Sequence, residues 1–180
     1  MESELEKIKP TEIAQENLWI TDLKQIEKLS DQQTESNQKF VELLKTKNTQ
    51  DLDTLVRSLS GSVAAGIDCK KCANCCKSLT VAANYQDSAK VAAGLNLEHA
   101  EFKAKYMKRD FEGDMVFKQR PCPFLKTNLC SVYENRPSTC RTYPHLEKGN
   151  FIGRIQNVLS NLKVCPIAYN TFELLKLNFE

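Results

Sequence analysis

Four of the chain's eight cysteines lie within eight residues, in the segment Cys69-Lys-Lys-Cys72-Ala-Asn-Cys75-Cys76. The other four all follow this segment in the chain: Cys122, Cys130, Cys140 and Cys165. The thiolate is the form of cysteine that binds metal, and a two-residue spacing lets two sulfurs face one ion. We therefore predict that the fold is organised around metal and that all eight cysteines are its ligands.

Four disulfide bonds are the main alternative use of eight cysteines, because disulfide frameworks are typical of small secreted domains. The first residues, Met1-Glu-Ser-Glu-Leu-Glu, are acidic and are not followed by an apolar run. They therefore do not resemble a secretory signal. We expect a reducing, cytoplasmic location without a membrane span, and cysteines that bind metal rather than pair with each other. Cysteines that only pack as small apolar side chains would not be expected to cluster.

The cysteine spacing leaves the identity of the metal open. Pairs of the type C-x2-C are common in tetrahedral zinc sites. The run Cys69-x2-Cys72-x2-Cys75 also matches the start of ferredoxin-type [4Fe–4S] segments, which end in Cys-Pro. Both Cys122-Pro123 and Cys165-Pro166 offer such an ending. Adjacent residues usually project in different directions, so Cys75 and Cys76 are not expected to bind the same ion. We therefore predict zinc or iron in two mononuclear sites, or an iron–sulfur cluster.

The N-terminal third is predicted to be a helical hairpin, because residues 11–60 contain neither glycine nor proline. Polar residues 30–38 are predicted to separate its two helices, and Gly61 is the candidate C-cap of the second. Apolar residues follow helical spacing in two stripes: Trp19, Leu23 and Ile26, then Leu52, Leu55, Val56 and Leu59. These patterns predict a helical extension at residues 1–62 and a cysteine-cluster domain at residues 63–180.

The rest of the chain combines short helices with a β-hairpin. We predict strands at 114–118 and 129–133 around turn residues 126–128, with Cys122 before the turn and Cys130 after it. Helices are predicted at 88–93, at 97–107 after an Asn96 N-cap, from Pro137 through Arg141, at 151–162 and from Cys165-Pro166 to 177. The predicted fold class is α+β and mainly helical: an N-terminal helical hairpin packed on a small, metal-pinned cysteine domain with C-terminal helices.

The charge is distributed unevenly along the chain. Residues 1–60 carry 8 basic and 12 acidic side chains, whereas residues 61–180 carry 17 basic and 11 acidic ones. The cysteine-bearing part therefore has an excess of cations that partly compensates bound thiolate charge. Its basic residues are scattered and the whole chain is only +2, so nucleic-acid binding is not favoured.

Order, type and spacing of the cysteines resemble those of the YkgJ cysteine-cluster family, which chelates zinc or iron. The resemblance spans about residues 65–178, and it rests on these motifs: Cys69-x2-Cys72-x2-Cys75-Cys76, Cys122-Pro-Phe-Leu, Cys130-Ser-Val-Tyr-Glu-Asn-Arg136-Pro-Ser-Thr-Cys140-Arg-Thr-Tyr-Pro144 and Cys165-Pro166. It implies a metal-chelating domain whose ligands are these cysteines. A flagellin lysine N-methylase has a similar motif, but this chain lacks a glycine-rich segment for S-adenosylmethionine, so methylation is not carried over.

Other side chains near the cysteines are candidates for supporting roles. Arg136 and Arg141 flank Cys140, and their guanidinium groups can donate hydrogen bonds to its sulfur or bind an acidic ligand. His99 is predicted not to be a ligand, and His145 is a replacement ligand only if one cysteine is not used. Phe124, Tyr133 and Tyr143 are expected to shield the metal from water.

Two classes of function fit these features. The first is a metal-binding module that organises a surface for a protein or peptide partner. The alternative is an iron- or iron–sulfur-dependent enzyme for redox chemistry or protein modification, and metal storage or delivery is a weaker third. The sequence contains no Ser/His/Asp or paired-carboxylate constellation that favours an enzyme.

Overall fold

The computed structural model describes residues 19–179. The chain is mainly helical with two small antiparallel sheets, so the predicted α+β class is confirmed. It forms two compact units: a helical unit built from the segments up to Asp68 and from Leu146 onward, and a cysteine unit, Cys69–His145. The part of the helix prediction at residues 11–18 lies outside the described residues. None of the described helices is long and apolar enough to cross a lipid bilayer.

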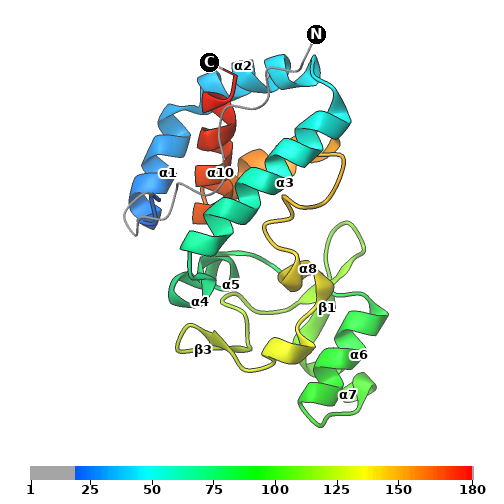
Figure 1. Cartoon of the computed structure of the whole chain (residues 1–180). Helices are drawn as coiled ribbons and strands as arrows, with labels where there is room; N and C mark the ends of the chain where they lie inside the picture. Colours follow the sequence, from blue (N-terminus) through cyan, green and yellow to red (C-terminus); the bar gives the residue numbers. More distant parts are fainter. Residues whose placement is uncertain (1–18, 180) are drawn as a thin grey trace. The chain divides into compact units, whose positions relative to one another are not determined.

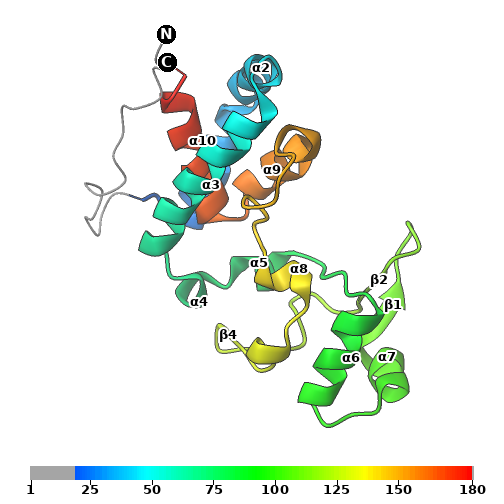
Figure 2. The same cartoon turned by 45° about the vertical axis from the view of Figure 1, so that its right-hand side comes forward.

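The helical unit joins N-terminal and C-terminal helices, and α10 packs against both α3 and α9 (Figures 1 and 2). This division into units does not coincide with the predicted boundary between residues 62 and 63. That boundary concerned folding domains, and it stays a prediction. The elements of the helical unit are α1 (Leu23–Gln32), α2 (Thr34–Lys45), α3 (Thr49–Gly66), η3 (Ile152–Arg154), α9 (Ile155–Leu162) and α10 (Pro166–Leu177).

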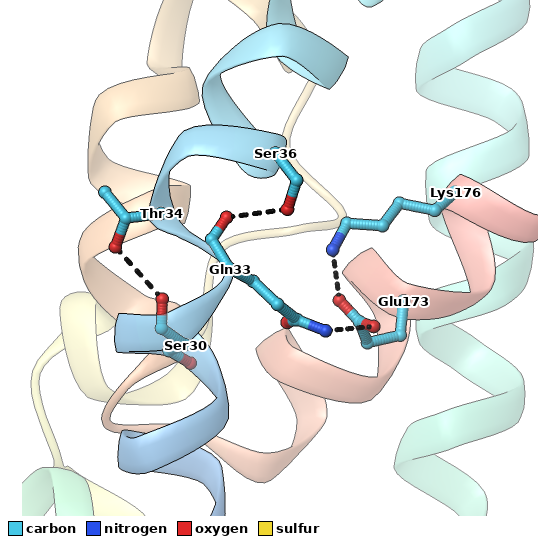
Figure 3. A network of polar contacts seen from close by, with 6 residues as sticks. All are labelled: Ser30, Gln33, Thr34, Ser36, Glu173 and Lys176. Atoms are coloured by element: carbon cyan, nitrogen blue, oxygen red, sulfur yellow. Dashed lines mark hydrogen bonds and ion pairs between the residues drawn. The ribbon is translucent and has the colours of Figure 1, made fainter.

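Large apolar side chains fill the helical unit. Ile26, Val56 and Leu175 are fully buried, and Phe172 packs edge-on against Phe40 with ring centroids 5.6 Å apart. A polar contact at the junction of α1 and α2 supports this packing (Figure 3). There Gln33 Nε2 donates to Glu173 Oε2 at 3.2 Å, and Lys176 Nζ donates to Glu173 Oε1 at 2.6 Å.

Two details of the N-terminal prediction differ from the structure. A break between helices does lie within residues 30–38, but it consists of Gln33 alone, and the polar Ser30 and Asn37 are buried in the helices on either side. Gly61 does not end a helix. Since α3 continues the same stripe to the fully buried Val63, the helix runs on to Gly66. The stripe's first residue, Trp19, precedes α1 rather than belonging to it.

The cysteine unit consists of short elements around one apolar cluster, in which Phe102, Phe117 and Phe124 contact one another. Its helices are α4 (Cys69–Cys72), α5 (Asn74–Ser78), α6 (Tyr85–Gly94), α7 (His99–Tyr106), η2 (Tyr133–Asn135) and α8 (Ser138–Arg141). Its strands are β1 (Met107–Arg109), β2 (Met115–Phe117), β3 (Leu125–Lys126) and β4 (Leu129–Cys130). The predicted helices at 88–93 and after Pro137 are confirmed.

The strand pairing differs from the prediction. Strand β2 pairs with β1, and β4 pairs with β3, so the cysteine-flanked hairpin is shorter than predicted. The turn is where we predicted it, with Thr127 and Asn128 both at positive φ. The predicted cap of α7 is also wrong. Glu98 precedes that helix, while Asn96 has a φ of 54° in the turn that follows α6, a conformation that asparagine tolerates.

Candidate metal centre

The CxxCxxCC segment folds as two consecutive helical turns, α4 and α5, that meet at Ala73. Ala73 N donates to Cys69 O at 2.9 Å, and Cys76 N donates to Ala73 O at 3.1 Å. Ala73 is buried and left-handed, with a φ of 50°. A left-handed residue between the turns changes the chain direction, so the last two cysteines belong to a separate turn from the first two.

The β3–β4 hairpin brings two further cysteines to this segment. Cys122 N donates to Cys76 O at 2.8 Å, which fixes the start of the hairpin beside the second turn. At the hairpin's end, Asn128 Nδ2 donates to Lys71 O at 3.2 Å. Two consecutive positive φ values are the geometry of the tight type I′ turn, which suits the twist of a two-residue hairpin. The hairpin is therefore bonded to the CxxCxxCC segment at both ends, with Cys130 in its second strand.

The short helix α8 carries a further cysteine of this unit, Cys140. The backbone N–H of Cys140 donates to Pro137 O at 3.0 Å, so the short helix begins where the proline favours it. Ser138 Oγ donates to Asp87 Oδ2 at 2.6 Å, and Asp87 is only 5% exposed. A buried carboxylate on α6 thus holds the helix that carries Cys140.

Four thiols from these segments share one electrostatic environment: Cys76, Cys122, Cys130 and Cys140. The last three pack against the same apolar cluster. Burial raises the pKa of Cys122 to about 11. Backbone N–H donors oppose this effect in part, and the charge of neighbouring cysteines adds to it. Burial and then the charges of the other three raise the pKa of Cys140 to about 12. Burial, with the charge of Cys76 as a smaller cause, raises the pKa of Cys130.

Cys76 behaves differently from its neighbours. A hydrogen bond with Cys75, whose sulfur lies 4.0 Å away, is the main cause that lowers the pKa of Cys76 to about 7. Burial opposes this effect, and the positive charge of Lys77 adds to it. The group therefore offers one thiol that ionises near neutral pH beside three that stay protonated without a cation.

The two predicted supporting arginines have different surroundings. The Arg136 guanidinium lies 3.6 Å from the centre of the Tyr133 ring, and its positive charge lowers the pKa of both Cys130 and Cys140. Arg141 is exposed on α8. Arg136 is thus within electrostatic reach of two of the four thiols.

The other predicted residues are distributed more widely. Cys69 is exposed and Cys72 is half-buried. Cys165 belongs to the helical unit, where it is 6% exposed at the predicted N-terminus of α10. His99 Nε2 lies 2.9 Å from Ser88 Oγ, and His145 Nδ1 lies 2.9 Å from Thr142 Oγ1.

The predicted shielding residues also differ in exposure. Phe124 is 3% exposed, Tyr143 is half-buried and Tyr133 is 42% exposed. Only Phe124 is thus fully buried behind the thiols that pack on its cluster, and Tyr133 presents part of its ring to solvent while Arg136 covers one side.

The chemistry of the donor set fits zinc or iron, because both ions accept four thiolates. In the described part of the cysteine unit, the three side chains whose ligand atoms lie within 4.8 Å of one another are carboxylates, the half-buried Asp110 and the exposed Glu112 and Asp114, and no three of the cysteine sulfurs lie that close together. A tetrahedral zinc–thiolate site needs sulfurs about 3.8 Å apart. Binding one ion would therefore draw the four sulfurs closer together. The acidic group itself was not predicted from the sequence.

Fold and site together define a small cysteine-rich metal-binding domain. Residues 68–166 match the CxxCxxCC family, described as a "Putative zinc- or iron-chelating domain", and the chain belongs to this family. It is also 33% identical over 81 residues to Uncharacterized protein MJ0661 of Methanocaldococcus jannaschii, a match that covers 43% of each chain. The chain thus spans less than half the length of that relative. No solved structure matches it.

Proposed function

We propose that the chain is a metal-binding module in which Cys76, Cys122, Cys130 and Cys140 hold one zinc or iron ion. The observation that supports this most directly is that Cys122, Cys130 and Cys140 pack against the same apolar cluster, while a backbone hydrogen bond joins Cys122 to Cys76. Three of these thiols are protonated at neutral pH because they are buried near one another. A bound cation stabilises thiolates, so it would take the place of those protons.

The remaining cysteines of the segment are proposed to serve a second centre. Cys69 and Cys72 lie in α4, apart from the turn that holds Cys76. Two mononuclear sites of four thiolates each would use all eight predicted ligands, whereas one iron–sulfur cluster would use four of them. Cys165 stays a predicted ligand on the basis of its helix N-terminal position.

Metal analysis of anaerobically purified protein tests the proposal. Colourless protein with zinc supports a structural module, and brown protein with iron and sulfide supports the alternative, an iron–sulfur enzyme or electron carrier. Protein that binds neither metal in stoichiometric amount contradicts both.

Single substitutions then test the ligand set. Cobalt(II) titration of Cys122→Ser, Cys130→Ser and Cys140→Ser should show loss of the same equivalent of tetrahedral thiolate absorption in each variant. The matched control is Ser131→Ala, an exposed residue beside Cys130, which should keep that absorption. Loss of different equivalents in the three variants would separate the thiols into different sites.

Arg136 is proposed to stabilise the thiolates of this centre from outside the ligand set. Its removal should weaken metal binding by about 10- to 100-fold, as is usual for groups that support ligands. Arg136→Gln should therefore lower affinity in a competition with a chromophoric chelator. Arg141→Gln, which changes an exposed arginine on the next helix, should leave it unchanged.

We further propose that the metal-organised surface serves a protein or peptide partner in a reducing compartment such as the cytoplasm. The surface around Arg136 supports this proposal because it exposes basic and aromatic side chains together. Thiols that are to bind metal must stay reduced, which such a compartment ensures.

A further inference from the structure

The most exposed large apolar side chain of the cysteine unit lies at the tip of the β1–β2 hairpin. Phe111 is 95% exposed, although the strands below it are anchored in the core by Met107 and Phe117. Three carboxylates surround it within five residues: Asp110, Glu112 and Asp114. We call residues 110–114 the acidic tip.

Hydrogen bonds hold the acidic tip in one conformation. Asp110 N donates to Asp114 O at 2.9 Å, and Asp110 Oδ1 accepts from the backbone N–H groups of Glu112 and Asp114. Arg109 donates to Gly113 O at 2.8 Å, and Gly113 has a φ of 90° that suits glycine. Phe111 is thus presented by an ordered loop, so little conformational entropy would be lost if it were inserted into another surface.

The same unit exposes a second surface of opposite charge, which we call the basic patch. Tyr133 is its centre, with Arg136 at 3.6 Å and Lys70 at 5.3 Å from the ring centroid. Leu129 is 55% exposed and pairs with Lys126 across the β3–β4 hairpin. We define the patch by Tyr133 with Lys70 and Arg136, and we extend it to Lys71, Lys126 and Leu129, because the hydrogen bond from Asn128 to Lys71 O joins the β3–β4 hairpin to the segment that carries Lys70. Glu134 is the acidic residue next to Tyr133 in the chain.

The two surfaces complement each other in both charge and polarity. The acidic tip offers an aromatic ring among carboxylates, and the basic patch offers an aromatic ring and a leucine among cations. The cysteine unit as a whole has 13 basic and 7 acidic residues, so the tip is opposite in sign to the unit that carries it. Such complementarity fixes the orientation of association and raises its rate.

The tip cannot reach the patch of its own unit. The β1–β2 loop and the β3–β4 hairpin lie at opposite sides of the cysteine unit in both views (Figures 1 and 2). We propose that the acidic tip of one copy of this chain docks on the basic patch of a second copy. Because the two surfaces differ, the contact is head-to-tail and repeats from copy to copy, as a ring or an open chain.

Sedimentation velocity of the full, metal-loaded chain tests this proposal. We expect association that increases with protein concentration and weakens with salt, since surface charge attraction is screened. Phe111→Ser should weaken it roughly tenfold or more, as expected for a central aromatic anchor. The matched control, Tyr85→Ser, removes another exposed aromatic residue of the same unit and should change nothing.

Mixing two variants gives the sharper result. The tip variant Phe111→Ser keeps its patch, and the patch variant Lys70→Glu/Lys126→Glu keeps its tip. Each variant alone should associate much more weakly than the wild type, whereas an equal mixture should form a heterodimer that cannot grow further. Wild-type protein that stays monomeric at low salt, or a mixture that stays monomeric, overturns the proposal. Metal content is measured on the same samples, so loss of metal is distinguished from loss of association.

Discussion

The helical unit and the cysteine unit are stabilised in different ways. The helical unit has helices of up to 18 residues, and its Val56, Phe172 and Leu175 are buried to 1% exposure or less. The cysteine unit has no described helix longer than 10 residues and no described strand longer than 3. Short helices and strands are only marginally stable by themselves, because few hydrogen bonds offset the conformational entropy lost when each one forms. The cysteine unit does have an apolar cluster of its own, but its short elements lead us to predict that it needs metal in addition, whereas apolar packing alone stabilises the helical unit.

Removing the metal should have the largest effect, and mainly on the cysteine unit, which carries seven of the eight predicted ligands. A structural zinc ion contributes about 10–16 kcal/mol of apparent binding free energy, which is comparable with the stability of a whole domain. After chelation, hydrogen exchange should become fast throughout residues 69–145 while α3 and α10 stay protected. Unchanged exchange in both units of the metal-free protein would show that the cysteine unit folds without metal.

Lowering the pH from 7 to 6 should have the next largest effect. Without metal, the raised pKa values keep Cys122, Cys130 and Cys140 protonated at both pH values, and Cys76 with a pKa of about 7 gains part of a proton. Metal must displace these protons, so acid weakens binding. We expect a loss of roughly three to four powers of ten per pH unit, measured by chelator competition.

The helical unit provides the control for this pH dependence. Both histidines of the chain, His99 and His145, belong to the cysteine unit. In the described part of the helical unit, burial raises the pKa of Tyr169 further above neutrality. The denaturant midpoint of the helical unit should therefore be the same at pH 7 and 6. A fall in metal affinity of less than tenfold would contradict the predicted protonation of the thiols.

A core substitution should have the opposite effect to metal removal: it should destabilise the helical unit and leave the metal content unchanged. Phe172 is 1% exposed and contacts Phe40, so Phe172→Ala should cost about 3–5 kcal/mol through lost burial and a cavity. Leu177→Ala, in the same helix but 61% exposed, should cost little. Denaturant unfolding measures both, and metal content should be unchanged in each. Loss of metal in Phe172→Ala would mean that the two units do not fold independently.

The sequence predicted best what depends on local pattern. Ser138–Arg141 after its proline, α6, the helix beginning after Cys165 and the turn at Thr127-Asn128 all follow from residue type and spacing. These signals lie within a few residues of the element they specify. The order and spacing of the cysteines also predicted the family to which the chain belongs.

What the sequence did not predict depends on contacts between distant segments. The pairing of β2 with β1 was missed because a three-residue strand carries too little pattern to name its partner. The polar Ser30 and Asn37 suggested a linker, although tertiary packing buries both. The sequence also did not predict which thiols come together. Their placement depends on the backbone hydrogen bond from Cys122 to Cys76 and on the hydrogen bond from Ser138 to Asp87.

The smallest predicted effect concerns a helix cap that only the helical unit should sense. Asn48 Oδ1 accepts hydrogen bonds from Gln50 N at 2.9 Å and Asp51 N at 3.2 Å, so it satisfies two backbone donors at the start of α3. Asn48→Ala should lower the free energy of unfolding of the helical unit by about 1 kcal/mol, and Asn48→Asp should retain it. Because α3 takes its stability from packing along its whole length, the cap adds to the helix without deciding whether it forms. If Asn48→Ala instead weakened metal binding, the start of α3 would be coupled to the cysteine unit, and the separation between packed and metal-stabilised regions would no longer hold.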